Sequence, residues 1–335
     1  MPSIYVQDPI NEDALAELRG RVNVIVGFGD DGVPIDAVIG DIDGLLVRTR
    51  VLDANTIEAA DRLRVIARYG VGCDNIDVGA ATRRGVPVLI APHANSESVA
   101  EHVFSLLLAV RRRTIACDRL VRTGRFHERD SELLHDLAGS TLGIIGLGRI
   151  GREVARIARD GFRMEVIGYD PWLQDALAGE PQAADVPPLE GRLDAVLSRS
   201  DAVTLHIPRT PETVGLIGRS EFLTMPAHAV LINTARGGIV DESALADALA
   251  DGQIAGAGID VLEQEPPEVD HPLFDLETVV LSPHNAGLTH RSTRRVGMAA
   301  AQGILDVLDG VPVETTDRDW LAVNGRDLQR HGQPG

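Results

Sequence analysis

Three polar residues of different chemical types each stand a few residues after an apolar, strand-like run in the C-terminal half of the chain. They are Arg236, Glu265 and His284, and each has a Gly or a Pro beside it. Because ligands of an open α/β sheet bind outside the carboxyl ends of its strands, we expect the three side chains to converge on one small anionic substrate. Any one alone would more simply be a solvated ion-pair partner, a surface acid or a capping histidine. Together they indicate a site.

A glycine-rich stretch provides a second candidate site. Gly146-Leu-Gly148-Arg-Ile-Gly151 follows a strand-like run and precedes a helical one. In that context the first Gly permits a tight turn, the second lets the backbone approach a pyrophosphate, and the third lets helix and strand pack closely. Asp170 lies 170 − 151 = 19 residues after the last Gly, close to the spacing of an acid that binds ribose hydroxyls. A carboxylate there favours NAD over NADP, so we predict an NAD site.

The composition limits the classes of partner. The chain has 335 residues, 32 of them basic and 50 acidic, for a formal net charge of -18. A surface this acidic repels nucleic acid and anionic membranes, so we expect neither as a partner. Cys73 and Cys117 form no CxxC pair, and we predict no disulfide framework and no metal site. The N-terminus lacks signal-peptide features and no apolar run reaches membrane-spanning length, so we expect a cytoplasmic protein.

Short β-branched runs alternate with helical stretches along most of the chain, which predicts parallel sheets covered by helices on both faces. The predicted strands are 4–6, 22–26, 44–47 and 65–68, then 140–145, 164–169, 202–205, 229–232, 255–260 and 279–281. Helices are predicted at 13–18, 54–60 and 243–250.

The pattern changes near residue 95. Ser98 and Glu101 have capping-box spacing, and they predict a long apolar helix that runs to Gly124. A last amphipathic helix is expected over 289–308, with no strand after it, packing back on the first domain. The polar tail from about Asn324 is expected to fray.

These motifs resemble the D-isomer-specific 2-hydroxyacid dehydrogenase family, and most closely its phosphoglycerate dehydrogenase-like branch without a C-terminal regulatory domain. The segments that carry the resemblance are 141–170, 206–216, 231–245, 258–267 and 281–296, with 48–49, 67–77 and 95–102 in the N-terminal half. The resemblance implies an α/β fold of two doubly wound parallel-sheet domains. A flavodoxin-like substrate-binding domain would comprise 1–97 and 288–335, and a Rossmann NAD-binding domain 98–287, with hinges near 95–100 and 285–290. It also implies a homodimer formed through the helix that starts near Val99.

Residue roles follow from the chemistry and agree with the resemblance. His284 protonates the substrate carbonyl oxygen and takes the proton back in reverse, Glu265 orients the imidazole, and Arg236 binds the substrate carboxylate or carbonyl. The predicted NAD-binding residues are Gly146, Gly148, Arg149, Ile150, Gly151, Asp170, His206, Pro208, Thr234, Ala235 and Asp260. The predicted substrate-binding residues are Arg48, Arg68, Val71, Gly72 and Arg236.

The expected activity is NAD-dependent interconversion of a small D-2-hydroxy acid and its 2-oxo acid by hydride transfer. Arg48 and Arg68 match positions where phosphoglycerate dehydrogenases carry arginines facing the substrate, which favours 3-phosphoglycerate. Reduction of glyoxylate or hydroxypyruvate is the alternative substrate assignment. A non-catalytic, NAD-sensing protein similar to the family's corepressors is the alternative outside enzymes, because fold alone does not decide function.

Overall fold

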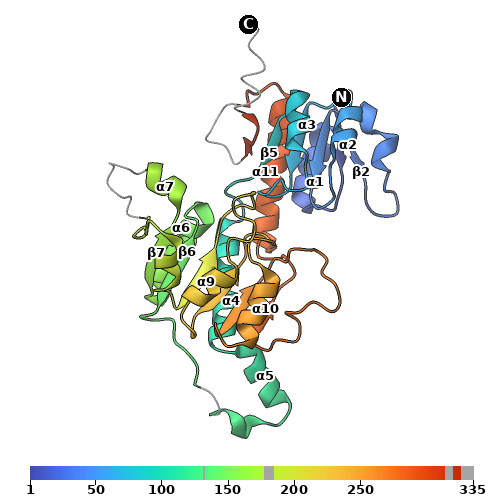
Figure 1. Ribbon diagram of the computed structural model, residues 1–335. Helices are drawn as coiled ribbons and strands as arrows, with labels where there is room; N and C mark the ends of the chain where they lie inside the picture. The colour runs from blue at the N-terminus through green and yellow to red at the C-terminus, as the bar shows by residue number, and fades with distance from the viewer. Residues whose placement is uncertain (131–132, 177–184, 314–319, 326–335) are drawn as a thin grey trace. The chain divides into compact units, whose positions relative to one another are not determined.

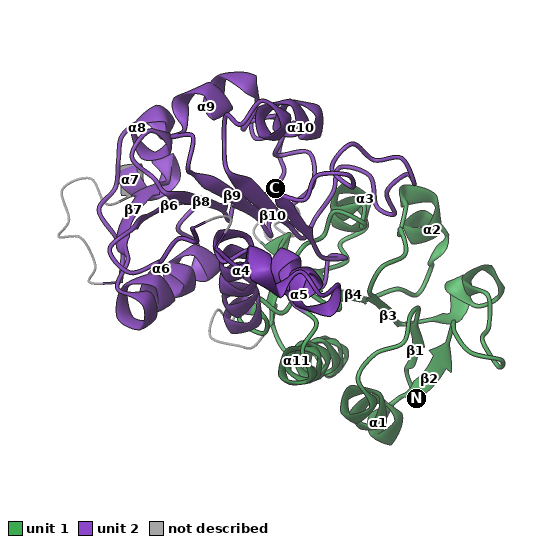
Figure 2. Cartoon of the chain, turned by 90° about the horizontal axis from the view of Figure 1, so that it is seen from below, with its two compact units in different colours: residues 1–95, 288–335 green, residues 96–287 purple. Residues whose placement is uncertain are grey.

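The computed structural model describes residues 1–130, 133–176, 185–313 and 320–325. The chain divides into two compact units, residues 1–95 with 288–335 and residues 96–287 (Figure 2). Each unit holds one six-stranded sheet with helices on both faces, and all neighbouring strands but one pair are parallel. The predicted α/β class with two doubly wound sheets is confirmed.

Unit 1 (residues 1–95 and 288–335) has a flavodoxin-like sheet. Its strand order is β12-β5-β4-β3-β1-β2, so the first five strands follow the order 2-1-3-4-5. The strands are β1 (Ser3–Val6), β2 (Asn23–Val26), β3 (Gly44–Val47), β4 (Val65–Arg68), β5 (Val88–Ile90) and β12 (Leu321–Ala322). Helices α1 (Glu12–Arg21) and α11 (His290–Leu308) cover one face, and α2 (Ala54–Ala59) and α3 (Val78–Arg83) the other (Figure 2).

The chain after α11 corrects two expectations. It returns to the sheet as β12, which pairs antiparallel with β5. Asn324, expected to fray, is 1% exposed. Its side-chain oxygen accepts the Val88 N–H at 2.9 Å, and its amide donates to the Val86 carbonyl at 2.9 Å and to Thr82 at 3.1 Å. A two-residue strand has no periodicity, so the sequence pattern could not reveal this anchor.

Unit 2 (residues 96–287) has a Rossmann-type sheet. Its strand order is β11-β10-β9-β8-β6-β7. Leu189 forms an isolated parallel bridge to Gly168 of β7. This bridge occupies the position that the third strand has in the Rossmann order 3-2-1-4-5-6. The strands are β6 (Thr141–Ile145), β7 (Glu165–Tyr169), β8 (Ala202–Leu205), β9 (Val230–Asn233), β10 (Gly256–Ile259) and β11 (Val279–Leu281). Strands β8, β9 and β10 are buried along their whole length, as expected for a parallel sheet covered on both sides.

The helices of unit 2 lie in two layers. Helices α4 (Ser96–Arg111) and α6 (Arg149–Phe162) cover one face of the sheet (Figures 1 and 2). The other face carries α8 (Leu193–Leu197), α9 (Arg219–Thr224) and α10 (Glu242–Ala250). The short α7 (Pro171–Ala176) follows β7.

The single long helix expected up to Gly124 is two helices. Helix α4 ends at Arg111, and α5 (Thr114–Arg122) begins after Arg113, which has a left-handed backbone with φ of 46°. The helix also starts earlier than its predicted cap, so Ser98 is buried inside α4. The apolar periodicity continues on both sides of Arg113, so the sequence pattern does not predict a break at this single left-handed residue.

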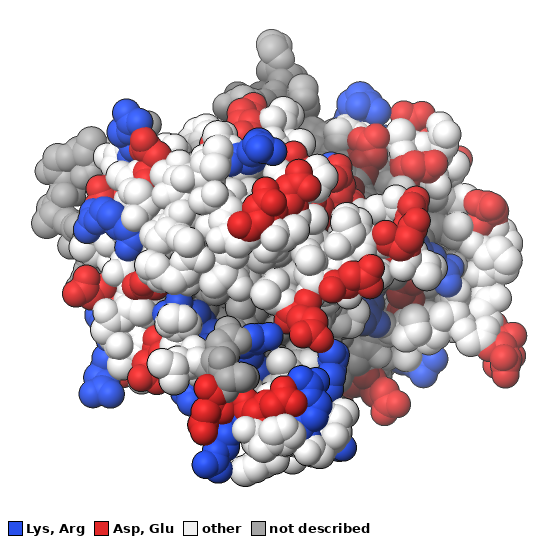
Figure 3. Space-filling model, turned by 60° about the horizontal axis from the view of Figure 1, so that its bottom comes forward, with Lys and Arg blue, Asp and Glu red and all other residues white. Residues whose placement is uncertain are grey.

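The surface carries both signs of charge. On the face drawn in Figure 3, arginines are interspersed with acidic side chains. Within the described residues, no helix is long and apolar enough to cross a membrane, and no cluster of three His, Cys, Asp or Glu residues is arranged to hold a metal ion.

Candidate active site

His284 and Glu265 form a hydrogen-bonded pair at the carboxyl edge of the unit 2 sheet. Nδ1 of His284 lies 2.7 Å from Oε2 of Glu265, and Oε1 of Glu265 accepts the Leu262 N–H at 3.0 Å. Glu265 belongs to the long connection after β10, and His284 follows β11, the neighbouring strand. The imidazole is therefore fixed at Nδ1, which leaves Nε2 for a substrate atom.

The charge of Glu265 suits this pairing. Burial raises its pKa, but the hydrogen bonds from His284 and from the Leu262 N–H outweigh that effect, and the pKa lies below its ordinary value. The carboxylate is thus ionised at neutral pH and presents a negative charge to the imidazole of His284.

The backbone around His284 is held by Asp260. His284 has a left-handed backbone with φ of 50°, which is uncommon for a non-glycine residue. Its N–H donates to the Asp260 carbonyl at 2.7 Å, and the Asp260 carboxylate accepts the N–H groups of Asn285 and Ala286 at 3.0 Å each and the Ser282 hydroxyl at 2.6 Å. Asp260 therefore positions the His284 turn. Its predicted contact with NAD stays a prediction.

This arrangement predicts a pH-dependent contribution to stability. Burial raises the pKa of Asp260, but its hydrogen bonds with His102, Ser282 and the two backbone N–H groups lower it from 3.8 to about 2. The contribution is therefore complete above about pH 4 and is lost as the pH falls towards 2. We expect Asp260→Asn to lower the free energy of unfolding by about 2 kcal/mol at pH 7, with a smaller difference at pH 3. Urea denaturation at both pH values measures this, and an equal difference at both would contradict it.

Arg236 lies on the loop after β9, next to the loop that carries Glu265. The Asn233 side chain braces this loop by donating to the Arg236 carbonyl at 3.0 Å and accepting the Ala235 N–H at 3.0 Å. A Cβ on Gly237 would lie 1.9 Å from the Leu262 carbonyl oxygen, so the two loops touch through their backbones. The structure thus places the three predicted catalytic residues on neighbouring loops of one sheet edge, with two of them in direct contact.

A largely apolar pocket adjoins the His284–Glu265 pair. It has a volume of about 480 Å³ and includes both residues of the pair. The apolar part of its lining is Leu262, Pro266, Pro267, Phe274, Leu281 and Pro283. The side chains of His284 and Glu265 are 51% and 37% exposed, so both are accessible from this pocket.

The glycine-rich stretch forms the turn between β6 and α6. Gly146 has φ of 92°, a conformation that favours glycine. A Cβ on Gly151 would lie 2.1 Å from the Gly146 carbonyl oxygen, whereas one on Gly148 would meet nothing within 4 Å. Gly148 thus leaves open space at the N-terminus of a 14-residue helix, and helix N-termini of this kind bind phosphate groups.

These contrasting environments predict different effects of two alanine substitutions. We expect Gly151→Ala to lower stability by about 1–3 kcal/mol through overpacking, and Gly148→Ala by less than about 1 kcal/mol. Both substitutions should weaken NADH binding. Gly151→Ala displaces the turn, and Gly148→Ala places a methyl group at the position assigned to the phosphate. Thermal unfolding and NADH fluorescence titration measure the two effects. Normal NADH affinity in Gly148→Ala would contradict the assigned phosphate position.

Asp170 and the remaining predicted NAD-binding residues lie along the same sheet edge. Asp170 follows β7, and its two carboxylate oxygens accept the N–H groups of Leu147 at 2.8 Å and Leu173 at 3.0 Å. The other predicted residues stand at the start of α6 (Arg149, Ile150), after β8 (His206, Pro208) and after β9 (Thr234, Ala235). Burial lowers the pKa of His206 to about 3, so this residue is neutral at physiological pH and adds no charge for a phosphate.

The predicted substrate residues Arg48 and Arg68 lie in unit 1 at the carboxyl ends of β3 and β4. The Arg48 guanidinium donates to the Pro9 carbonyl at 3.0 Å and lies 5.7 Å from the centre of the Tyr69 ring. Arg68 donates to the Tyr69 carbonyl at 2.5 Å. Both arginines therefore surround Tyr69, at the start of the loop that contains Val71 and Gly72.

Asp8 is a buried residue of this region that sequence reasoning missed. Its carboxylate accepts the N–H groups of Thr49 at 3.0 Å and Arg48 at 3.3 Å, and pairs with the Arg50 side chain at 3.2 Å. It thereby fixes the loop that carries Arg48. The sequence does place Asp8 just after β1, at the carboxyl edge of the sheet, and this position could have identified it.

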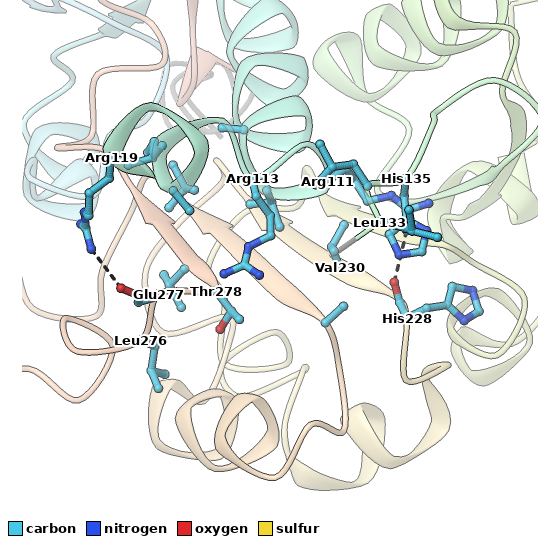
Figure 4. A pocket seen from close by; sticks show the side chains of 18 of the residues that line it. Arg111, Arg113, Arg119, Leu133, His135, His228, Val230, Leu276, Glu277 and Thr278 are labelled. Carbon is cyan, nitrogen blue, oxygen red and sulfur yellow. Dashed lines mark hydrogen bonds and ion pairs between the residues drawn. The ribbon is translucent and has the colours of Figure 1, made fainter. Parts of the chain in front are cut away.

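A second pocket of unit 2 lies at the opposite, amino-terminal end of its strands. It has a volume of about 380 Å³ and contains none of the predicted site residues. Figure 4 shows Arg111, Arg113, Arg119 and His135 around it, with Arg119 bonded to Glu277 at 3.0 Å.

Comparisons with known proteins give a consistent result. A family model described as the NAD binding domain of D-isomer specific 2-hydroxyacid dehydrogenases matches residues 104–286. A D-3-phosphoglycerate dehydrogenase of Archaeoglobus fulgidus is 40% identical over 312 residues, which are 92% of this chain but only 58% of that relative. A glyoxylate reductase of Korarchaeum cryptofilum is 39% identical over 337 residues, covering 98% of this chain and 99% of the relative. Among solved structures, the TT0316 protein of Thermus thermophilus superposes with a TM-score of 0.82 at 34% identity, over 92% of this chain and 97% of that one.

Proposed function

Because the chain belongs to the D-isomer specific 2-hydroxyacid dehydrogenase family, we propose that it interconverts a small D-2-hydroxy acid and its 2-oxo acid by hydride transfer. The matched NAD-binding domain makes NAD the cofactor. The observation that carries the proposal is the 2.7 Å contact between His284 and Glu265 at the carboxyl edge of that domain's sheet.

Each residue of the site has a distinct role in this proposal. NAD, when bound, supplies the acceptor or donor of the hydride. His284 gives a proton from Nε2 to the substrate oxygen in reduction and takes it back in oxidation. Glu265 holds Nδ1 and stabilises the imidazolium, so the ring stays oriented while its charge changes. Arg236 binds the substrate carboxylate through charge-assisted hydrogen bonds.

We assign 3-phosphoglycerate as the substrate, with glyoxylate or hydroxypyruvate as the alternative. The position of Arg48 and Arg68 on adjacent strand ends supports a phosphate site in unit 1. The names of the relatives include both activities, and the chain spans 58% of the first relative but 99% of the glyoxylate reductase. The two arginines favour the phosphorylated acid.

A direct comparison of substrates tests this assignment. We expect NAD-dependent oxidation of 3-phosphoglycerate to exceed the reaction of unphosphorylated acids at least about tenfold in kcat/KM, since charge-assisted hydrogen bonds contribute roughly 1.5–3 kcal/mol each. Arg48→Ala should raise KM for the phosphorylated acid alone, and Arg19→Ala, an exposed residue of α1, serves as the control. Faster turnover of glyoxylate or hydroxypyruvate would establish the reductase. NADH binding with no turnover of any acid would favour the corepressor-like alternative.

The quaternary and cellular assignments are also proposals. We propose a homodimer through the helix that starts near Val99, and apolar side chains exposed on the next helix, α5, and on the segment after it support a contact in this region. They are Ile115, Val121, Phe126, Leu133 and Leu134. A cytoplasmic location is proposed alongside the homodimer. Analytical ultracentrifugation of the chain and of Phe126→Glu tests the dimer, and an unchanged mass in the variant would exclude this contact.

A further inference from the structure

Glu242 carries a carboxylate that is mostly, but not fully, buried and lies outside the catalytic pair. It is the first residue of α10, and its side chain is 12% exposed. One carboxylate oxygen accepts the Glu263 N–H at 2.6 Å, and the other lies 2.8 Å from Nε2 of His271, whose side chain is 13% exposed. Both partners belong to the connection between β10 and β11.

The tautomer of His271 follows from its two hydrogen bonds. Nδ1 of its ring accepts the Leu273 N–H at 3.3 Å, so the ring proton is on Nε2 and is donated to Glu242. Leu273 is 1% exposed, so this end of the arrangement is embedded in the core of unit 2.

An acid in the first turn of a helix is common because it complements the helix dipole. An exposed acid would serve that purpose equally well, and burying a carboxylate carries a desolvation cost unless it is fully hydrogen-bonded. Glu242 directs both oxygens to the connection between β10 and β11. Its position therefore indicates that it holds this connection in place.

The connection needs such a contact because it is long and carries Glu265. It runs over residues 260–278 without a helix or strand, and connections of this length are usually functional. Glu263, which Glu242 binds, directly follows Leu262. The Leu262 N–H donates a hydrogen bond to Glu265. The Leu262 carbonyl lies so close to Gly237, the residue after Arg236, that a Cβ there would clash with it. A shift at Glu263 would therefore move both Glu265 and the loop of Arg236.

We propose that Glu242, together with His271, is a positioning residue for the acid–base site: it fixes the backbone at Glu263 and thereby sets the Glu265–His284 contact. This role in catalysis rests on the proposed function. Glu242 touches neither His284 nor the pocket beside it, so its effect is transmitted through Leu262 and Glu263.

The test compares two glutamates of unit 2, Glu242 and Glu221. Each lies in the first turn of a helix and accepts a hydrogen bond from a backbone N–H group. Glu242→Gln weakens the bond to Glu263, because a neutral amide oxygen accepts a hydrogen bond less strongly than a carboxylate, and it presents an amide to the Nε2 proton of His271. Glu221→Gln is the matched control, because Glu221 accepts the Gly218 N–H at 3.1 Å at the start of α9, away from the site. We expect about a tenfold fall in kcat for Glu242→Gln with an unchanged KM for NADH, since small displacements of reacting groups are costly. The control should keep both values.

A second readout does not depend on turnover. The pKa of Glu265 is held below its ordinary value by the hydrogen bonds from His284 and Leu262, against the opposing effect of burial. We expect this pKa to rise in Glu242→Gln and to stay unchanged in Glu221→Gln, as followed by ¹³C NMR of the side-chain carboxyl with Glu265→Gln for assignment. If Glu242→Gln fails to fold, His271→Gln, which leaves the Glu242–Glu263 bond in place, is expected to show a smaller change in the same direction.

The outcomes separate the two proposals. A protein that reduces no 2-oxo acid would refute the proposed function, while the Glu265 titration would still decide whether Glu242 positions the pair. A Glu242→Gln variant with lower thermal stability but an unmoved Glu265 titration and normal kcat would overturn the positioning role.

Discussion

Replacing His284 with Ala is expected to lower turnover by about 10²–10⁴-fold while leaving NADH affinity nearly unchanged, because general acid–base catalysis is typically worth that much. Nδ1 of the His284 imidazole is hydrogen-bonded to Glu265 at 2.7 Å, which leaves Nε2 available for proton transfer. The glycine-rich turn is a separate element after β6, so removal of the imidazole should not disturb it. Steady-state kinetics with the preferred acid and NADH fluorescence titration measure the two quantities.

His228 provides a closely matched control. Its side chain is 52% exposed against 51% for His284, and its Nε2 also lies 2.7 Å from a carboxylate, that of Asp201. It stands at the opposite end of the same sheet, beside the pocket of Figure 4. His228→Ala should therefore turn over normally. Equal losses in both variants would show that the effect of His284→Ala is on folding, and near-normal turnover in His284→Ala would remove its assigned role.

The sequence predicts the buried strands well because their residues have little choice of environment. The predicted strands 44–47, 65–68 and 202–205 coincide with the largely buried β3, β4 and β8. Short and mostly apolar runs of this kind have few alternatives in a sheet covered on both faces. The left-handed residue at Arg113 and the two-residue strand β12 carry no such pattern, and these are the places where the expected elements were wrong.

The candidate site divides along a similar line. Arg236, Glu265 and His284 were identifiable because each follows a strand, and parallel strands bring such positions to one edge. Their roles stay predictions, although two of the side chains are in contact. Asp8 and Glu242 were not identified, because they act through backbone N–H groups of segments distant in sequence. The spacing of residues in the sequence does not predict which distant loop such a carboxylate contacts.

Cofactor choice is expected to depend strongly on Asp170. Its carboxylate is fixed after β7 by the N–H groups of Leu147 and Leu173, and Leu147 belongs to the glycine-rich turn itself. The acid is thus tied to the turn that receives the pyrophosphate, at the position where the adenosine ribose hydroxyls of NAD would donate hydrogen bonds to it. A 2′-phosphate would instead place like charges in contact.

The size of the discrimination follows from the Coulomb energy. Two unit charges about 4 Å apart repel by roughly 4 kcal/mol at an effective dielectric constant of 20, and partial exposure of Asp170 reduces this. We therefore expect NADH to bind at least about 10²-fold more tightly than NADPH. Asp170→Ala should weaken NADH binding through loss of the ribose hydrogen bonds and bring the two affinities together. The ratio of the two dissociation constants is the quantity to measure, because a general effect on folding lowers both affinities alike and leaves it unchanged. A wild-type protein that binds NADPH as well as NADH would show that a cation elsewhere at this edge compensates for Asp170, and the exposed Arg149 at the start of α6 would be the first residue to replace.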